Sequence, residues 1–413
     1  MSDISKARVL ALFSGGLDSI LAARLVQEQG MDVQCLHFVT PFFGTPEKVS
    51  FWRKHYGLNV RCIDIGDEFV RMLAQWPAHG FGSVLNPCVD CKILMMRQAK
   101  RLMEEEGAVC VVSGEVLGQR PMSQRRDTLN IIHRDAELKG KLLRPLSALL
   151  LDPTEVEEAG IIDRTQLLGI AGRGRKQQVE LAARWGITDF PQPSGGCRLT
   201  EQENARSYWP ILAYCPNPLA ADFYLANTGR QFWYNDRDDA KENFAPDATP
   251  DATPATAPDA TPGAAPDATP DAMPDAAPAT APDATPDAVP GAAFRLIVGR
   301  KKDDNERLME LAGEQDLLFK VRDFPGPIAV GRHMGSPWPQ DLVASAAAFV
   351  ASYCPKAVRH AQESGEAIAV RVHTGSLDCP GSILTLVPGR SFAWREWLWE
   401  EAKSMQTQRA RQK

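Results

Sequence analysis

The stretch Ser14-Gly15-Gly16-Leu17-Asp18-Ser19 constrains the fold of this chain more than any other part. It follows an apolar run over 9–13 that is long enough for one buried strand, and a helical pattern over 20–26 follows it. Two adjacent glycines at such a turn let the backbone approach a ligand closely, because no Cβ stands in the way. The N–H groups of the turn and of the helix N-terminus point into one small space, which is the geometry that binds phosphate. The stretch therefore predicts a phosphate loop, to which Ser14 and Ser19 add hydroxyl donors.

Asp18 adds a requirement for a metal ion to this loop. A carboxylate would repel a phosphate unless a divalent cation lay between them, so we expect Mg²⁺. The alternative interpretation is a plain turn at a helix N-terminus, because turns are rich in Gly and Ser. The Gly-Lys-Ser/Thr ending of the kinase and GTPase P-loop is missing here, so a different phosphate chemistry is indicated.

Strands alternate with helices through the first part of the chain, which predicts an α/β fold with a parallel sheet covered on both faces. Ligands in such sheets bind beyond the carboxyl ends of the strands. Three segments should meet there, namely the phosphate loop, the strand end at 35–40 and the turn at 113–115. The expected strands are 9–13, 33–38, 59–65, 109–112 and 142–146, and the expected helices include 46–57, 67–75 and 92–106.

A tetrapeptide array occupies 246–293, with proline at every fourth position from Pro246 to Pro290. It has no apolar face, so we expect a disordered spacer. Strand-like runs flank it at 228–234 and 294–300, which predicts an insertion between two neighbouring strands of one α+β domain. That domain should continue with helices at 305–312 and 341–353, strands near 317–321, 368–373 and 382–387, and a final Trp-rich helix.

Charge and composition restrict the class of protein. The net charge of −6 includes eight aspartates, and no Lys, Arg or Glu, within 246–293, so the remainder carries +2 and can present a basic face. The N-terminus has no apolar signal segment, and no run is long enough to span a bilayer. Nine cysteines, an odd number, suit a reducing compartment. We therefore expect a cytoplasmic protein that does not enter membranes.

Three cysteines are candidates for the chemistry. Cys88 and Cys91 form a Cys-x-x-Cys just before a helix, where the helix dipole would lower a thiol pKa or both sulfurs would bind one metal or cluster. Cys197 follows two glycines that permit close approach to a ligand. Three thiolates suit a [4Fe–4S] cluster with one open iron, or a zinc site completed by another residue. Cys215 is a weaker fourth candidate, and three unconnected thiols are the alternative.

A Gly-rich segment over 112–120 contains Gly114 and Gln119 and should close over a nucleotide held by the phosphate loop. A solvated polar loop is the alternative. Basic residues that could form a rim for RNA, or simply be solvated, are Arg125, Arg126, Arg144, Arg173, Arg175 and Lys176.

The motifs SGGLDS, NPCVDCK, SGEVLGQRPMSQ, LLRPL and SGGCRLT occur in this order across 8–200. This part resembles the tRNA thiolation branch of the ATP pyrophosphatases, or PP-loop enzymes. SGEVLGQ…SQ and LLRPL are similar to tRNA 4-thiouridine synthetases. The Asn-Pro-x-x-x-Cys that ends at Cys91 is similar to the 2-thiouridylases, in which the catalytic cysteine occupies that position. Cys197 matches a second family cysteine, and the additional Cys88 makes the set similar to thiolases with an iron–sulfur cluster.

The resemblance implies an adenine nucleotide α-hydrolase-like domain that cleaves ATP to AMP and pyrophosphate. It implies catalytic roles for Cys91, Cys197 and Asp18, and cluster ligation by Cys88, Cys91 and Cys197. The residues expected to bind ATP are Ser14, Gly15, Gly16, Leu17, Asp18, Ser19, Phe38, Gly114 and Gln119.

The segment from about 222 to 395, without the spacer, resembles the NFACT-type RNA-binding domain through 298–300, 319–326 and the helix at 341–353. No rhodanese-like or THUMP-like region is visible, so this domain would take the place of the usual tRNA-docking module. Arg300 joins the candidate RNA contacts of the first domain, which are Arg125, Arg126, Arg173, Arg175 and Lys176.

The expected divisions are a PP-loop domain over 1–205, a connector with the first strand of the C-terminal domain over 206–245, the insertion over 246–293, an RNA-binding domain over 294–400 and a basic tail over 401–413. The sequence contains no indication of the oligomeric state.

The expected function is a tRNA sulfurtransferase. ATP would adenylate a uridine carbonyl, and sulfur would then displace AMP to give 4-thiouridine or 2-thiouridine, both of which fit. Sulfur would come from sulfide or a cysteine desulfurase persulfide, carried as a persulfide on Cys91 or Cys197 or as sulfide on the open iron. The alternatives are an AMP-forming amine ligase, which would not need the cysteines, and a non-catalytic protein that binds nucleotide and RNA.

Overall fold

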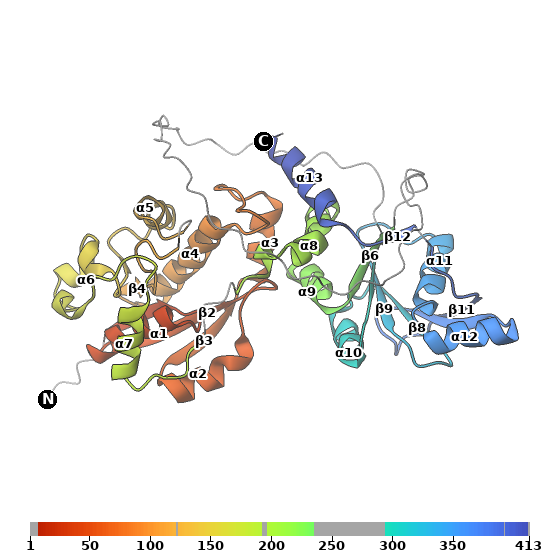
Figure 1. Cartoon of the computed structure of the whole chain (residues 1–413), viewed down its shortest axis with the longest axis horizontal. Helices are drawn as coiled ribbons and strands as arrows, with labels where there is room; N and C mark the ends of the chain where they lie inside the picture. The colour runs from red at the N-terminus through yellow and green to blue at the C-terminus, as the bar shows by residue number, and fades with distance from the viewer. Residues whose placement is uncertain (1–6, 121–122, 192–195, 235–293, 392, 412–413) are drawn as a thin grey trace, which may run out of the picture.

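The computed structural model describes residues 7–120, 123–191, 196–234, 294–391 and 393–411. Two lobes lie side by side along the long axis, the first built on a parallel sheet and the second on an antiparallel sheet (Figure 1). The proline-rich array at 246–293, predicted to be a disordered insertion, lies outside the described residues. Among the described helices, none has the length and apolarity that a membrane crossing requires.

The first lobe has a five-stranded sheet in the order β3-β2-β1-β4-β5, and all neighbouring strands are parallel. The predicted α/β class and strands of the first domain are therefore confirmed. Because β2 lies on one side of β1 and β4 on the other, the strand order reverses at β1, which is where such sheets bind ligands. The strands are β1 (Arg8–Leu12), β2 (Asp32–Val39), β3 (Asn59–Asp64), β4 (Cys110–Val112) and β5 (Leu142–Leu143).

Strand β1 alternates between two buried faces. Val9 and Ala11 pack into one core, and Leu10 and Leu12 pack into the other, as the period of two in a strand requires. Helices α1, α2 and α7 cover the first face, and α4 and α5 cover the second. The helices of this lobe are α1 (Leu17–Glu28), α2 (Val49–Tyr56), α3 (Gly66–Ala74), α4 (Cys88–Glu106), α5 (Arg126–Asp135), α6 (Glu155–Glu158) and α7 (Lys176–Arg184).

The second lobe has a seven-stranded sheet in the order β11-β10-β8-β9-β7-β6-β12, with antiparallel neighbours throughout. Strands β6 and β7 pair directly, and Phe232 stands opposite Leu296. The prediction that the strands on either side of the array are neighbours is therefore confirmed. The strands are β6 (Arg230–Tyr234), β7 (Arg295–Val298), β8 (Leu317–Val321), β9 (Ile328–Arg332), β10 (Ile368–Thr374), β11 (Ser382–Leu386) and β12 (Trp394–Arg395).

A third core joins the two lobes. It contains Phe42 and Phe69 from the first lobe, Trp209 and Trp233 from the second, and Ala402 near the end of the chain. The predicted boundary at 205 falls inside α8, and the predicted basic tail over 401–413 is instead helix α13 through residue 411, packed against α8. The remaining helices are α8 (Gln202–Tyr214), α9 (Ala220–Thr228), α10 (Lys302–Leu311), α11 (Gln340–Ala351), α12 (Pro355–Ser364) and α13 (Trp399–Arg411).

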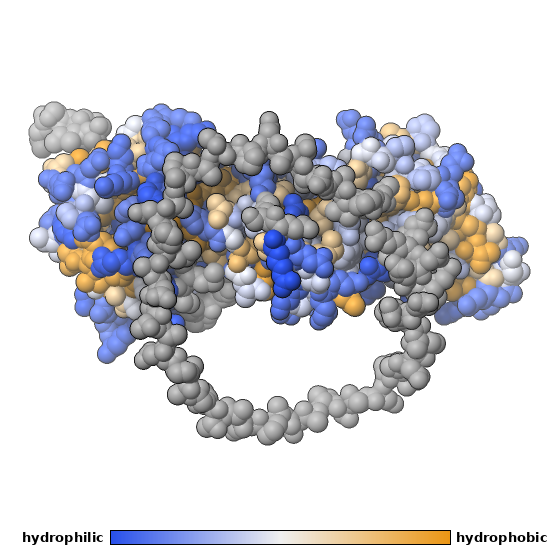
Figure 2. All heavy atoms as spheres, turned by 90° about the horizontal axis from the view of Figure 1, so that it is seen from above, coloured by the Kyte–Doolittle hydropathy of each residue, from blue (hydrophilic) through white to orange (hydrophobic). Residues whose placement is uncertain are grey.

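Seen from above, hydrophilic side chains cover much of both lobes, and apolar areas are interspersed towards the two ends (Figure 2). Surface of this mixed kind is ordinary for a folded protein in water.

Candidate functional site

The phosphate loop lies where β1 passes into α1. Gly16 is the N-cap of α1, and no side chain of the described residues caps the helix. The first N–H groups of a helix have no acceptor within the helix, so those of Leu17 and Asp18 can meet a ligand, whereas the N–H of Gly16 donates to Ser14 Oγ at 3.3 Å. The hydroxyl of Ser19 donates to the carbonyl of Gly16 at 2.8 Å and fixes the turn, while Ser14 is exposed. This turn has the form expected of an anion cradle, and phosphate binding by it stays a prediction.

Two side chains that sequence analysis missed, Trp52 and His37, pack behind the phosphate loop. A Cβ at Gly15, which has φ +77°, would lie 2.5 Å from the Trp52 ring, so only glycine fits there. His37 is buried and packs edge-on against Trp52, with ring centroids 4.7 Å apart. Its Nδ1 is 2.9 Å from the carbonyl of Phe13, and its Nε2 accepts from the N–H of Thr45 at 2.9 Å. Both bonds are satisfied by a neutral imidazole that donates through Nδ1.

The turn after β4 lies against the phosphate loop. A Cβ at Gly114 would lie 2.6 Å from the carbonyl oxygen of Asp18, so this turn is in backbone contact with α1. Gln119 reaches the same residue, because its Nε2 donates to Asp18 Oδ2 at 2.8 Å. Gln178 of α7, fully buried and not predicted, donates to Gln119 Oε1 at 3.4 Å. The segments predicted to converge on the sheet edge are thus together.

The surroundings of the second carboxylate oxygen of Asp18 indicate whether a metal ion fits at the phosphate loop. Asp18 Oδ1 is buried and has no hydrogen-bond partner among the described residues. A buried carboxylate oxygen without a donor is costly unless a cation meets it, and Mg²⁺ prefers such oxygens. The residues present therefore fit the divalent cation that the phosphate chemistry implies.

Arg144 is not part of a basic rim, contrary to the sequence prediction. Its side chain is only 4% exposed and its Nε is 3.1 Å from Glu115 Oε2, whose side chain is 2% exposed. It also donates to the carbonyl of Leu129 at 3.5 Å. A buried cation needs a buried anion, and Glu115 follows directly on Gly114, so the pair fixes the turn beside the phosphate loop.

Cys88 and Cys91 both lie in the first turn of α4 and are half-buried. Asp90, between them, is buried and accepts the N–H groups of Ala78 and His79, each at 3.0 Å. Asn86 donates from Nδ2 to the sulfur of Cys88 at 3.2 Å. Side chains within the motif thus hold the loop that precedes α4 and orient the first thiol.

Two backbone hydrogen bonds bring the distant Cys197 to this motif. The N–H of Leu85 donates to the carbonyl of Leu199 at 3.1 Å, and the N–H of Arg198 donates to the carbonyl of Phe42 at 3.0 Å. Cys197 and Cys88 are close enough that each sulfur contributes to the electrostatic surroundings of Cys91. We call Cys88, Cys91 and Cys197 the thiol site. Cys215 packs against the same core but does not enter this electrostatic group.

The expected low pKa at Cys91 is wrong. Burial raises the pKa of Cys91 well above its usual range, and the nearby ammonium of Lys92 offsets this only in part. Burial also raises the pKa of Cys197 to about 11, against a smaller lowering by the N–H of Leu199. Desolvation disfavours the thiolate more strongly here than the helix N-terminus favours it.

The thiol site is the predicted location of an iron–sulfur cluster or a single metal ion. Among the described residues, no group of three or more His, Cys, Asp or Glu could hold one metal ion. A cubane cluster accepts thiolates that are farther apart, because each sulfur binds a different iron atom. Three thiols converge here from two distant segments, and they are the ligand type that such clusters use.

A short chain of contacts joins the thiol site to the phosphate loop. Lys92, next to Cys91, extends its Nζ to 3.9 Å from Glu115 Oε1. Glu115 follows Gly114, which is in contact with Asp18. The thiol site and the phosphate loop therefore share one edge of the sheet.

The other predicted residues lie in several places. Phe38 is buried in the core of the second sheet face, and its contact with ATP stays a prediction. Arg125 and Arg126 are exposed at the start of α5, and Arg173, Arg175 and Lys176 precede or open α7. The N–H of Gly172 donates to the carbonyl of Leu117 at 2.8 Å. Arg173, Arg175 and Lys176 therefore lie close to the segment 112–120. Arg300 belongs to the second lobe and pairs with Asp304 at 2.9 Å.

Two segments of the chain match different known families. Residues 4–159 match the family model described as thiamine biosynthesis protein (ThiI), and residues 288–376 match that of the NFACT protein RNA-binding domain. A curated protein of Thermococcus kodakarensis, "Probable tRNA sulfurtransferase", is 31% identical over 156 residues, which are 35% of this chain and 38% of that protein. The chain thus spans well under half the length of this relative.

Two solved structures are also similar in part. The U34-tRNA thiolase NcsA of Methanococcus maripaludis, solved with its [4Fe–4S] cluster, is 15% identical with a TM-score of 0.26, covering 46% of this chain and 61% of that one. The C-terminal part of a fibronectin/fibrinogen-binding protein of Streptococcus suis is 18% identical with a TM-score of 0.21, covering 24% and 44%. At these values nothing further is transferred from either structure to this chain.

Proposed function

We propose that this chain, which joins a ThiI-type PP-loop domain to an NFACT-type RNA-binding domain, is an ATP-dependent tRNA sulfurtransferase of the cytoplasm. It would adenylate a carbonyl oxygen of a uridine in tRNA and replace that oxygen with sulfur. Sulfide or a cysteine desulfurase persulfide would supply the sulfur.

One observation carries this proposal. Cys197 docks beside Cys88 and Cys91 through the Leu85–Leu199 bond, at the sheet edge that also holds the phosphate loop. An enzyme that only joined an amine to an adenylated substrate would not need three thiols at this position. An adenylating site beside a sulfur-carrying site is what the exchange of oxygen for sulfur requires.

In the first step the uridine oxygen attacks the α-phosphorus of ATP, and pyrophosphate leaves. The N–H groups at the start of α1 and the hydroxyl of Ser14 would bind the departing pyrophosphate, while Ser19 keeps the turn in place through its bond to Gly16. Asp18 would hold Mg²⁺, which when bound offsets the charge of the phosphates. Gln119 keeps Asp18 oriented through its 2.8 Å bond to Oδ2, so the other oxygen faces the cation.

In the second step hydrosulfide attacks the activated ring carbon, the C–S bond forms, AMP leaves with the former uridine oxygen, and a proton is released. Where a persulfide on Cys91 or Cys197 attacks instead, the thiol of the other cysteine would cleave the S–S bond of the adduct, which supplies the two electrons and leaves a Cys91–Cys197 disulfide. Cys88, Cys91 and Cys197 would hold a [4Fe–4S] cluster. When bound through three thiolates, the cluster has one iron without a protein ligand, where the sulfur to be transferred can be held. The half-buried position of the three thiols limits the access of water to the activated carbon.

The test compares Cys91→Ser and Cys197→Ser with Cys62→Ser, which replaces an exposed thiol of the same lobe. Proteins purified without oxygen are incubated with ATP, sulfide and unmodified tRNA. Pyrophosphate release and the thiolated nucleosides of the digested tRNA are measured, the latter by mass spectrometry. We expect the first two variants to lose thiolation and to keep ATP binding, and Cys62→Ser to behave as the unchanged protein.

Pyrophosphate release by the unchanged protein and by the Cys91 and Cys197 variants, with no thiolated nucleoside from any of them, would contradict sulfur transfer and favour an amine ligase. Continued thiolation by the two variants would exclude these thiols as the sulfur carriers. Absence of pyrophosphate release from the unchanged protein would favour a non-catalytic role. A preparation without iron would leave a persulfide on Cys91 or Cys197 as the sulfur carrier and would exclude the cluster.

A further inference from the structure

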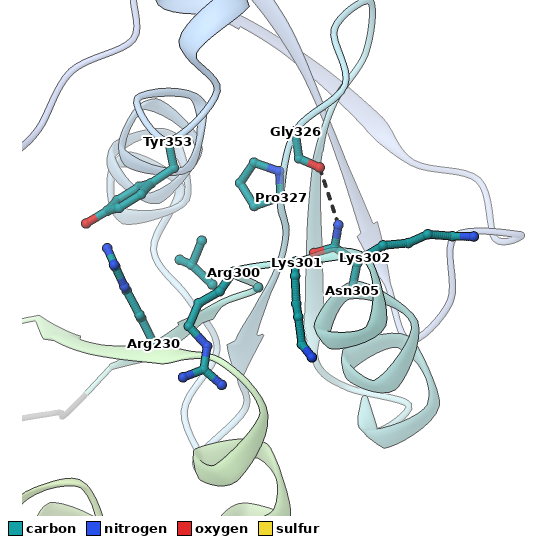
Figure 3. Close-up of a pocket in the computed structure, with 10 residues that line it drawn as sticks. Arg230, Arg300, Lys301, Lys302, Asn305, Gly326, Pro327 and Tyr353 are labelled. Carbon is teal, nitrogen blue, oxygen red and sulfur yellow. Dashed lines mark hydrogen bonds between the residues drawn. The ribbon is translucent and has the colours of Figure 1, made fainter. Parts of the chain in front are cut away.

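Two adjoining cavities form one groove at the junction of the lobes. The first has a volume of about 430 Å³ and lies between the start of α10, the turn at Gly326 and the ring of Tyr353 (Figure 3). The second has a volume of about 670 Å³ and lies between α8, α9, β6 and the segment before α13. Arg230 and Arg300 line both cavities, so the two adjoin at these side chains. We call the whole the arginine groove.

Cations dominate the charged lining of the arginine groove. The only two carboxylates among the described lining residues, Glu203 and Glu396, both pair with Arg206, at 2.8 and 3.0 Å. Six cations accompany these two carboxylates in the lining. Three of the six, Arg300, Lys301 and Lys302, also pair with carboxylates that lie outside the lining. The basic lining residues are Arg198, Arg206, Arg230, Arg300, Lys301 and Lys302.

Two of these arginines keep an uncompensated charge. Within the described part of the chain, neither Arg198 nor Arg230 forms an ion pair, and both are exposed. Figure 3 shows the guanidinium of Arg230 directed towards the hydroxyl end of Tyr353, whereas Lys302 points away from it. Arg300 is held by Asp304 and by the carbonyl of Thr228, so its guanidinium has a fixed position in the groove.

One end of the groove lies at Arg198, the chain neighbour of a thiol-site residue. Arg198, which lines the second cavity, follows Cys197 directly in the chain. Its N–H is bonded to the carbonyl of Phe42, which fixes the same segment that places Cys197. The groove thus runs from the second lobe to the residue beside the sulfur chemistry.

Aromatic side chains accompany the cations. Trp397 is half-buried and lines the second cavity, and Tyr353 lines the first. A basic channel with aromatic rings along it is the combination that binds single-stranded nucleic acid, because phosphates meet the cations while bases stack on the rings. A bound protein would not need arginines and aromatic rings to alternate in this way, so nucleic acid is the favoured occupant of the groove.

We propose that the arginine groove binds the single-stranded stretch of tRNA that carries the target uridine, with its phosphates on Arg230, Arg300 and Arg198 and its target base at the end next to Cys197. This inference rests on the proposed function for the identity of the RNA. Because α8, β6, β7 and the segment before α13 all contribute to the groove, it requires the complete chain.

The test measures binding of a fluorescent, unmodified tRNA transcript to the full-length protein, without ATP or a sulfur donor, over a series of salt concentrations. Arg198→Gln and Arg230→Gln each remove one charge from the groove. Lys320→Gln is the matched control, because Lys320 is exposed on β8 and does not line the groove. Thermal unfolding of each variant verifies that the fold is retained.

We expect each arginine variant to bind tRNA more weakly and to reduce the slope of log affinity against log salt by about one, the value for one lost phosphate contact. The control should match the unchanged protein, and a single-stranded oligonucleotide should compete with tRNA better than a duplex of equal length. Equal losses in Lys320→Gln, no change in either arginine variant, or stronger competition by the duplex would each overturn the proposal.

The same experiment separates this inference from the proposed function. Because neither ATP nor sulfur is present, the binding result is independent of catalysis. If the arginine variants lose tRNA binding and the unchanged protein never thiolates tRNA, tRNA binding in the groove is supported and the sulfurtransferase function is rejected. If the arginine variants bind and thiolate tRNA normally, the sulfurtransferase function is supported and tRNA binding in the groove is rejected.

Discussion

Gly114 and Asp18 are in backbone contact, and a Cβ on Gly114 would lie 2.6 Å from the carbonyl oxygen of Asp18. Gly114→Ala should therefore push the turn after β4 away from α1 and open the phosphate loop. We expect weaker ATP binding and a loss of stability of about 1–3 kcal/mol, as for other overpacked sites. Titration calorimetry with ATP and urea unfolding measure the two effects. Gly174→Ala is the control, since its Cβ would meet nothing within 4 Å.

Gln178 should act as a positioning residue for Asp18. Its amide holds Gln119, which in turn holds Asp18 Oδ2. Gln178→Leu keeps the volume but removes the donor, so Asp18 should hold its cation less well. We expect the Mg²⁺ concentration needed for half-maximal pyrophosphate release to rise by about tenfold, as for other residues that orient metal ligands. Gln177→Leu, at the exposed neighbouring position, should leave it unchanged; an equal rise there would refute the role of Gln178.

His37 should make the first lobe less stable in acid. Burial lowers the pKa of His37 below the 6.5 of an unburied imidazole, although the carbonyl of Phe13 and the carboxylate of Glu47 oppose this. The unfolded chain therefore binds a proton more readily than the folded chain. The contribution to stability is complete above about 6.5 and falls as the pH decreases towards the folded pKa.

His37→Gln tests this dependence. Glutamine does not titrate, so the variant should lose less thermal stability than the unchanged protein between about pH 8 and about pH 5. His133, whose pKa burial also lowers, remains in both proteins and sets the residual slope. Parallel pH profiles for the two proteins would show that His37 stays neutral in both states or is not buried.

Arg295 should be essential to the second lobe. It is 1% exposed, and it donates to the side chain of Gln231 and the carbonyl of Asp222, both at 2.7 Å. Arg295→Met would leave Asp222 with Arg332 as its one ion-pair partner among the described residues. Removing one member of a buried charged network costs about 3–5 kcal/mol. Urea unfolding followed by tryptophan fluorescence should show an earlier transition, whereas Arg371→Met on the exposed side of β10 should show little change.

The periodic part of the fold could be predicted from the sequence because it depends on local rules. The run at 9–13 alternates sides in β1, and the motif at 14–19 forms the turn that its glycines indicate. The pairing of β6 with β7 across the proline-rich array was also predictable, since both flanks have strand-forming residues. Strand β9, helix α12 and the helices that join the lobes were missed, because their patterns are short or lack clear boundaries.

The parts that could not be predicted depend on contacts between distant segments. The residues around Trp52 do not indicate that its ring packs against Gly15. Helix periodicity predicts which side of the helix is buried, but it does not predict which distant residue that side contacts. The rule that a helix N-terminus lowers a thiol pKa is sound, yet at Cys91 the burial created by the third core outweighs it. Arg144 looked like a surface cation because its partner Glu115 lies far away in the chain.

Helix α13 has a consequence for when the protein becomes active during its synthesis. Its Gln406 donates to the carbonyl of Val84 at 2.9 Å, and Arg409 donates to the carbonyl of Leu212 at 3.2 Å. The segment before the thiol site is therefore completed by a residue that lies 322 positions later in the chain. A nascent chain can fold its parallel sheet early, but it cannot finish the surroundings of Cys88 until α13 has been made and has left the exit tunnel.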